Sequence, residues 1–90
     1  MSRGSVTIGS GSAILVVSAN VNRLSLVIVN NGSSFIYLGD DSLVTTTTGL
    51  PVDSFSSYYE DSGGQRTYLG DYYAISEDST NDVRYWERER

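Results

Sequence analysis

The stretch RLSLVIVNNGSSFIYLGDD, residues 23–41, predicts a β-strand paired in a hairpin. Its first eight residues alternate between two sets of side chains, which is the two-residue period of a strand. One set is apolar throughout: Leu24, Leu26 and Ile28. Asn31-Gly32 follows directly, and this dipeptide predicts a hairpin because both residues accept positive φ. We therefore expect residues 35–38 to return as the partner strand.

The second face of this strand is unusual. It begins with the polar Arg23 and Ser25 but turns apolar at Val27 and Val29. Leu24, Leu26 and Ile28 most simply fill the core of the domain, so the two valines need a cover of their own. That cover is either the apolar segment 13–17 of the same chain or a neighbouring subunit.

The rest of the chain predicts an all-β fold, because short β-rich runs alternate with turn signals and no helical period is sustained. Pro51 indicates a corner between strands rather than a central strand. Strands are expected at 6–8, 13–18, 43–48, 52–60, 66–76 (one broken strand or two short ones) and 83–89. Seven to nine short strands favour a small antiparallel β-sandwich or barrel, jelly-roll-like, with extended terminal arms.

A single β domain is expected, because the chain has 90 residues. We divide it into an N-terminal arm at 1–12, a β core at 13–84 and a C-terminal tail at 85–90. A chain of this length has a thin core, and it has no Cys for disulfides and no His for a transition metal. Self-association or docking on a partner is therefore the expected source of additional stability.

The charge pattern argues against nucleic acid and favours a protein interface. The formal net charge is −5, whereas nucleic-acid binders need a basic field. All six cations are Arg, and the chain has seven Tyr and one Trp, which are types enriched at interfaces. The longest apolar run, Ala13 to Val17, is too short to span a bilayer. We expect neither nucleic acid nor membrane as a partner.

Catalysis, cofactors and metals are not expected from these residues. The chain has neither His nor Lys to activate its many hydroxyl groups. A pair of carboxylates could serve a glycosidase, but a domain of this size rarely has room for the cleft. The acidic clusters at 40–41 and 77–78 lack the alternating spacing of a calcium loop and are typical of turns.

The C-terminal VRYWERER is the most informative candidate site. In a strand, Arg84, Trp86, Arg88 and Arg90 share one face, opposite a face that becomes acidic. This face could anchor a neighbouring subunit through Trp86, with the arginines as carboxylate partners. The alternative is a frayed, solvated tail.

Tyrosines supply the remaining candidates. Adjacent residues of a strand point to opposite faces, so one member of each Tyr pair can be core and the other outward. Outward tyrosines suit a protein interface or a sugar platform. The complete candidate interface set is Trp86, Arg84, Arg88, Tyr58, Tyr59, Tyr68, Tyr72, Val27 and Val29.

The strings ANVNRLSLVIVNNGSSFIYLGDDSLVTTTTGLPV and YYAISEDSTNDVRYWE resemble a family of small structural proteins of tailed bacteriophages. The resemblance covers roughly residues 20–84, and the chain departs from the family pattern at 53–70. The arm at 1–12 and the tail after Trp86 lie outside it. The matching positions are Asn22, Arg23, Asn30, Gly32, Tyr37, Gly39, Val44, Thr45, Gly49, Pro51, Tyr73, Ala74, Ile75, Ser76, Asp82, Val83 and Arg84.

That resemblance implies a capsid cement (decoration) protein on the virion surface, made in the host cytoplasm. Its expected partners are the major capsid protein and further copies of itself in a homotrimer. It would bridge neighbouring capsid subunits and stabilise the expanded shell without catalysis. The alternatives are another virion component, such as a tail, fibre or head–tail joining protein, and a small carbohydrate-binding module.

Overall fold

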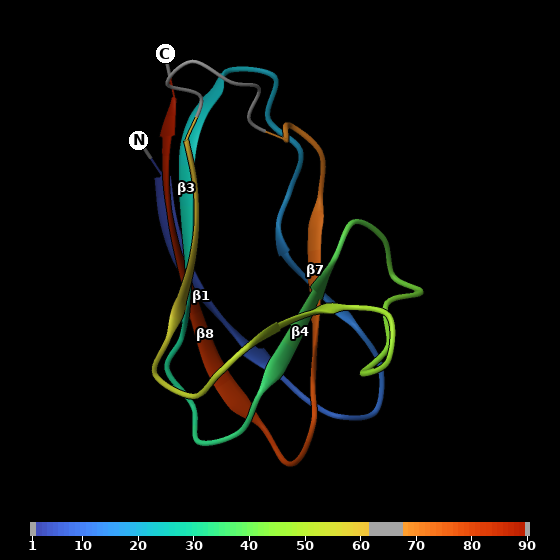
Figure 1. Cartoon of the computed structure of the whole chain (residues 1–90). Coiled ribbons are helices and arrows are strands. Elements are labelled where there is room, and N and C mark those ends of the chain that lie inside the picture. The colour runs from blue at the N-terminus through green and yellow to red at the C-terminus, as the bar shows by residue number, and fades with distance from the viewer. Residues whose placement is uncertain (1, 62–67, 90) are drawn as a thin grey trace.

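The computed structural model describes residues 2–61 and 68–89, and these form two facing antiparallel sheets (Figure 1). One sheet has the strand order β1-β8-β3-β6 and the other β2-β7-β4-β5. The eight strands are β1 (Ser2–Ile8), β2 (Ile14–Val17), β3 (Arg23–Asn30), β4 (Ile36–Gly39), β5 (Leu50–Val52), β6 (Ser57–Asp61), β7 (Tyr72–Ser76) and β8 (Asn81–Glu89).

The strand pairing is that of a jelly roll. The first strand pairs with the last, β2 with β7, β3 with β6, and β4 with β5, as if a long hairpin were rolled into a sandwich. Two further pairs, β3 with β8 and β4 with β7, join these strand pairs into the two four-stranded sheets. The all-β, jelly-roll-like sandwich expected from the sequence is confirmed.

The predicted hairpin at Asn31-Gly32 is wrong, because β3 and β4 belong to different sheets. The loop between them crosses the end of the sandwich, and the fully buried Asn30 determines its path. The Asn30 side-chain amide donates hydrogen bonds to the carbonyls of Ser34 at 2.8 Å and Val52 at 3.1 Å. Its side-chain oxygen accepts the Gly32 N–H. Asn30 thereby replaces the ladder bonds that a hairpin would have made.

The core lies between the sheets, and Leu26 and Ile28 are fully buried in it as expected, whereas Leu24, the third residue predicted there, is only partly buried. The position predicted for Arg23 is wrong. The two-residue alternation places Arg23 on the polar outer face, whereas in the structure its side chain is buried. The register of β3 against β8 shifts between Arg23 and Ser25, and this irregularity changes the face that Arg23 occupies. The other buried apolar residues are Ile8, Val16, Val17, Ile36, Leu38, Val44, Val52, Tyr72, Ala74 and Val83.

The strand predicted at 43–48 is absent, and these residues form turns. The Thr48 hydroxyl accepts the Thr45 N–H at 3.0 Å, and the Thr45 carbonyl accepts the Gly49 N–H at 2.9 Å. Local side-chain and backbone bonds therefore override the β propensity of threonine. The long strand expected at 52–60 is also divided, because residues 53–56 turn the chain from one sheet to the other.

The terminal segments are strands of the sandwich rather than free arms. Ser2–Ile8 pairs with Asn81–Glu89 along its whole length, and β8 pairs on its other side with β3. The division into an arm at 1–12 and a tail at 85–90 therefore differs from the structure. The run of small residues at the N-terminus carries little strand signal by itself, but pairing with β8 satisfies its backbone groups.

Candidate interaction surface

The alternation predicted for residues 83–89 is present in β8. Val83 and Glu87 are buried on the inner face, whereas Arg84, Trp86 and Arg88 are exposed on the outer face. Arg90 lies outside the described residues. The outer face of the sheet β1-β8-β3-β6 therefore carries Trp86 between two arginines of the same strand.

One row of residues crosses all four strands of this face. Arg3 of β1 lies opposite Trp86 of β8, which lies opposite Val27 of β3, which lies opposite Tyr59 of β6. The next row runs from Ser5 through Arg84 and Val29 to Ser57. We call this surface the arginine face and define it by Arg3, Val27, Val29, Tyr59, Arg84, Trp86 and Arg88.

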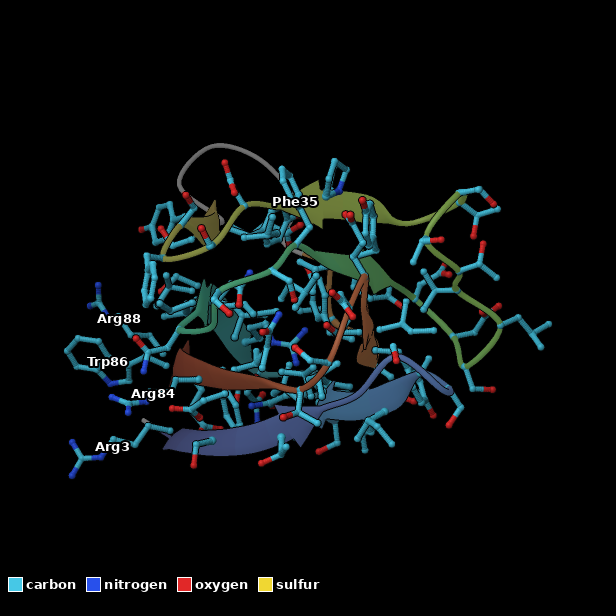
Figure 2. All side chains as sticks on the ribbon, turned by 90° about the horizontal axis from the view of Figure 1, so that it is seen from below. Arg3, Phe35, Arg84, Trp86 and Arg88 are labelled. Atoms are coloured by element: carbon cyan, nitrogen blue, oxygen red, sulfur yellow. The ribbon has the colours of Figure 1, made fainter. Side chains whose placement is uncertain are left out.

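The aromatic side chains of the arginine face are open to solvent. Trp86 is 52% exposed and Tyr59 is 61% exposed, although both lie within a paired sheet. Arg3, Arg84, Trp86 and Arg88 project from the same side of the molecule, and Phe35 lies apart from them (Figure 2). A large aromatic surface among charged residues is characteristic of interaction sites rather than of solvated sheet faces.

Shallow hollows lie on both sides of Trp86. One lies over β1 and β8 and is lined by Arg3, Ser5, Arg84 and Trp86 together with backbone neighbours. The other lies over β3 and is lined by Ser25, Val27, Tyr59, Trp86 and Arg88. The indole ring of Trp86 therefore projects between two hollows, so a complementary surface can contact the ring on both sides.

The arginine face carries three exposed arginines in a chain of net charge −5. Arg84 Nη2 lies 3.0 Å from Asp82 Oδ2, and a hydrogen bond from Asn31, followed by the charge of Arg84, holds the pKa of Asp82 below its ordinary value. Within residues 2–61 and 68–89, Arg3 and Arg88 form no ion pair. Every exposed arginine of the described part lies on this face.

Val27 and Val29 are half-buried, and the segment 13–17 does not cover them. That segment forms β2, which lies at the edge of the opposite sheet. Their neighbours on the outer face are Trp86, Arg84 and Tyr59. Of the two covers expected from the sequence, the segment is therefore excluded, and a neighbouring subunit stays a prediction.

The other three candidate tyrosines lie elsewhere, around a cleft between the two sheets. Tyr72 is only 6% exposed and Tyr58 packs against the core, whereas Tyr68 is 40% exposed. The cleft has a volume of about 200 Å³. We call it the tyrosine cleft and define it by its lining: Leu38, Gly39, Asp40, Leu50, Tyr58, Glu60, Tyr68 and Tyr72.

Two features of the structure were not predicted from the sequence. Arg3 falls in the segment expected as an arm, although alternation of Arg3, Ser5 and Thr7 with Val6 and Ile8 could have indicated a strand. The Arg23–Glu87 pair joins positions 64 residues apart. No local pattern indicates that pair.

Comparison with protein-family models, curated proteins and solved structures finds no match to this chain. The resemblance to phage structural proteins therefore stays a prediction. The described residues contain no helix long and apolar enough to cross a membrane. Their side chains also form no group of three or more residues suited to holding a metal ion.

Proposed function

We propose that this protein is a non-catalytic cement (decoration) protein of a tailed-phage capsid and that the arginine face binds the major capsid protein. The observation that carries the proposal is the position of Trp86, half exposed at the centre of a paired sheet with Arg3, Arg84 and Arg88 around it. The resemblance of residues 20–84 to phage structural proteins supplies the virion context. Fold alone does not decide function, since jelly rolls occur in both capsid proteins and lectins.

The composition of the arginine face supports a protein partner. Its centre is apolar and aromatic, with Val27, Tyr59 and Trp86, and its cations are arginines. Stable interfaces have this anatomy, in which Trp, Tyr and Arg supply most of the binding free energy. Arg3 and Arg88, which form no ion pair within the described residues, favour a surface rich in Asp and Glu, because forked hydrogen bonds to carboxylates can then form.

The mechanism requires several weak contacts rather than one strong contact. A homotrimer presents three arginine faces, so the second and third contacts form at a high effective concentration. Capsid subunits joined in this way resist separation even when each single contact is modest. The proposed location is accordingly the outer surface of the virion, after synthesis in the host cytoplasm.

The direct test is a binding assay on purified expanded heads that lack the protein. We expect saturable binding of the wild-type chain and at least about tenfold weaker binding of Trp86→Ala, since truncating a central aromatic residue costs 2 kcal/mol or more. Phe55→Ala is the matched control, because Phe55 is also an exposed aromatic residue, at 71%, but lies outside the arginine face. An equal loss of head binding in both variants would contradict the assignment of the arginine face as the binding site.

Oligomeric state and copy number test the rest of the proposal. We expect sedimentation equilibrium to give the mass of a trimer. We expect a stained gel of purified particles to show hundreds of copies of the protein per virion. Six or twelve copies would support a tail, fibre or head–tail joining protein instead. A persistent monomer would remove the avidity on which the mechanism depends.

A carbohydrate-binding module is the second candidate, and the tyrosine cleft together with exposed Trp86 favours it. Aromatic rings are the usual stacking surface for sugars. This candidate predicts retention on polysaccharide resin and loss of retention in Trp86→Ala or Tyr68→Ala. Retention of the protein on polysaccharide resin, without binding to phage heads, would favour the carbohydrate-binding module over the capsid proposal.

A further inference from the structure

The tyrosine cleft has features that neither the capsid proposal nor the sandwich core requires. Three tyrosines surround it, from β6, from β7 and from the segment before β7, and their rings are in contact. Tyr68 meets the ring of Tyr72 edge-on at 5.2 Å between centroids, and Tyr58 lies 6.1 Å from Tyr72 on its other side. The volume of about 200 Å³ is similar to that of cavities that hold one benzene molecule.

A buried polar atom at the cleft lacks a partner. The hydroxyl of Tyr72 makes no hydrogen bond of normal length and angle to a described residue, although the residue is only 6% exposed and Glu60 and Tyr58 lie near enough to raise its pKa. Tyr58, by contrast, donates its hydroxyl proton to Glu60 Oε2 at 2.6 Å. Buried hydroxyl groups are nearly always paired, so a cation that enters the cleft and donates to the oxygen of Tyr72 would supply the missing hydrogen bond.

The surroundings of the cleft are acidic. Asp40 and Glu60 belong to its lining. Burial and the charges of Asp40, Asp71 and Asp41 raise the pKa of Tyr68, so these carboxylates act on the cleft from the adjoining turns. The combination of acidic groups and aromatic rings stabilises positive charge, through Coulomb attraction and through the electron-rich ring faces.

One guanidinium group already contacts this tyrosine cluster from the interior. Arg23 Cζ lies 5.5 Å from the centroid of the Tyr72 ring. Its charge is balanced by Glu87, whose Oε2 lies 2.6 Å from Arg23 Nε, and its other nitrogens donate to the carbonyls of Ser18, Tyr68 and Gly70. Arg23 is thus held by contacts within the fold, and its charge lowers the pKa of Tyr68, which opposes in part the effect of Asp40, Asp71 and Asp41.

From these observations we infer that the tyrosine cleft is a binding site for an organic cation, such as a guanidinium or alkylammonium group. The cation stacks against the tyrosine rings, donates a hydrogen bond to Tyr72 Oη and faces the carboxylate of Asp40 at the rim. This inference stands independently of the proposed capsid function. Its two sources are a free small cation and the arginine side chain of a second copy of this chain.

The test is an NMR titration of the full chain, labelled with ¹⁵N, at constant ionic strength. The probe is N-acetyl-arginine amide, and the matched neutral control is N-acetyl-citrulline amide, which has nearly the same shape without the charge. We expect saturable shifts at the amides of Asp40, Tyr68 and Tyr72 with the arginine probe and none with the citrulline control. Equal shifts with both probes, or no shifts with either, would overturn the inference.

Variants locate the contacts. Tyr72→Phe removes only the hydroxyl and is expected to weaken probe binding by about tenfold, as for a hydrogen bond to a charged group. Asp40→Asn is expected to weaken it by about two- to fivefold, because this carboxylate is exposed. Tyr37→Phe is the control, since the Tyr37 hydroxyl bonds Glu77 away from the cleft. If Tyr37→Phe and Tyr72→Phe behave alike, the cleft is not the site.

A dilution series distinguishes the sources. If the arginine face of a second copy supplies the cation, the same amides shift with protein concentration without added probe, and the shift disappears when Arg3→Gln, Arg84→Gln and Arg88→Gln are combined. Spectra independent of concentration, together with a positive titration, identify a free cation. Each of these results upholds a cation site, whereas a negative titration in all variants refutes it.

Discussion

Arg23 and Glu87 form a buried ion pair that joins β3 to β8 inside the sandwich, with 2.6 Å between Nε and Oε2. Their side chains are 0% and 5% exposed. Arg23 also reaches the carbonyls of Ser18, Tyr68 and Gly70, which precede and follow strands of the opposite sheet. The pair therefore fastens the two sheets at one end, where apolar packing gives way to the tyrosine cleft.

Glu87→Gln is expected to lower the free energy of unfolding by about 3–5 kcal/mol, because it leaves a buried guanidinium without its counter-charge. Urea unfolding followed by circular dichroism measures the change. Arg84→Gln breaks an exposed pair and serves as the control, with an expected cost below about 1 kcal/mol. Similar costs for both variants would mean that Arg23 does not depend on Glu87.

Asn30→Ala is expected to destabilise the fold by about 2–4 kcal/mol, since several buried groups lose their hydrogen-bond partner at once. The affected groups are the Val52 carbonyl and the Gly32 N–H, together with the carbonyls of Ser34 and Asp53, which keep second hydrogen bonds from Asn81 and Ser56. The same unfolding experiment on Asn22→Ala, at an exposed asparagine of the preceding turn, provides the comparison. A neutral Asn30→Ala would show that the crossing loop is held by other contacts.

Alkaline conditions are expected to destabilise the protein through Tyr72. Burial, and then Glu60 and Tyr58, raise the pKa of Tyr72 above its ordinary value of 10.0. The folded state therefore keeps a proton that the unfolded state loses above about pH 10. The stabilisation is fully present below that pH, and the free energy of unfolding falls as the pH rises above it.

Tyr72→Phe should reduce this alkaline loss in urea-unfolding midpoints measured on both sides of pH 10. Tyr58 and Tyr68 also have raised pKa values, so part of the slope should remain. An unchanged slope in Tyr72→Phe would exclude Tyr72 as the group responsible.

Binding through the arginine face is expected to weaken with salt, because exposed charges are screened. This prediction rests on the proposed capsid function. Raising NaCl from about 0.05 M to about 0.5 M should weaken binding to expanded heads. Arg88→Gln should bind less tightly at low salt and respond less to added salt, whereas Thr46→Gln, in the exposed 45–48 turn, should behave as wild type. Salt-independent binding would point to the apolar residues alone.

Phe55 is a strained exposed residue, with φ of 57° and 71% exposure. This left-handed conformation is unfavourable for a bulky side chain, whereas Asn tolerates it. Phe55→Asn is expected to raise the free energy of unfolding by about 1 kcal/mol, measured by thermal and urea unfolding. A destabilised variant would show that the Phe55 ring makes contacts that outweigh the strain.

Much of the fold follows from sequence patterns of short range. The two-residue period predicts the strand at 23–30 and its buried Leu26 and Ile28. The same period separates Arg84, Trp86 and Arg88 from the buried side of the last strand. Turn signals between short strands predict the antiparallel sandwich. These features depend on residues within a few positions of one another, so the sequence alone is sufficient to predict them.

The partners of these strands were decided only in the tertiary structure. A hairpin signal at Asn31-Gly32 does not join β3 to β4, because the buried amide of Asn30 directs the chain to the other sheet. Arg3 reaches Trp86, and Arg23 reaches Glu87, across most of the chain length. In a jelly roll the first strand pairs with the last, so distant residues meet through sheet register and side-chain packing. Local sequence determines which face a side chain occupies, and long-range register determines which neighbours it meets there.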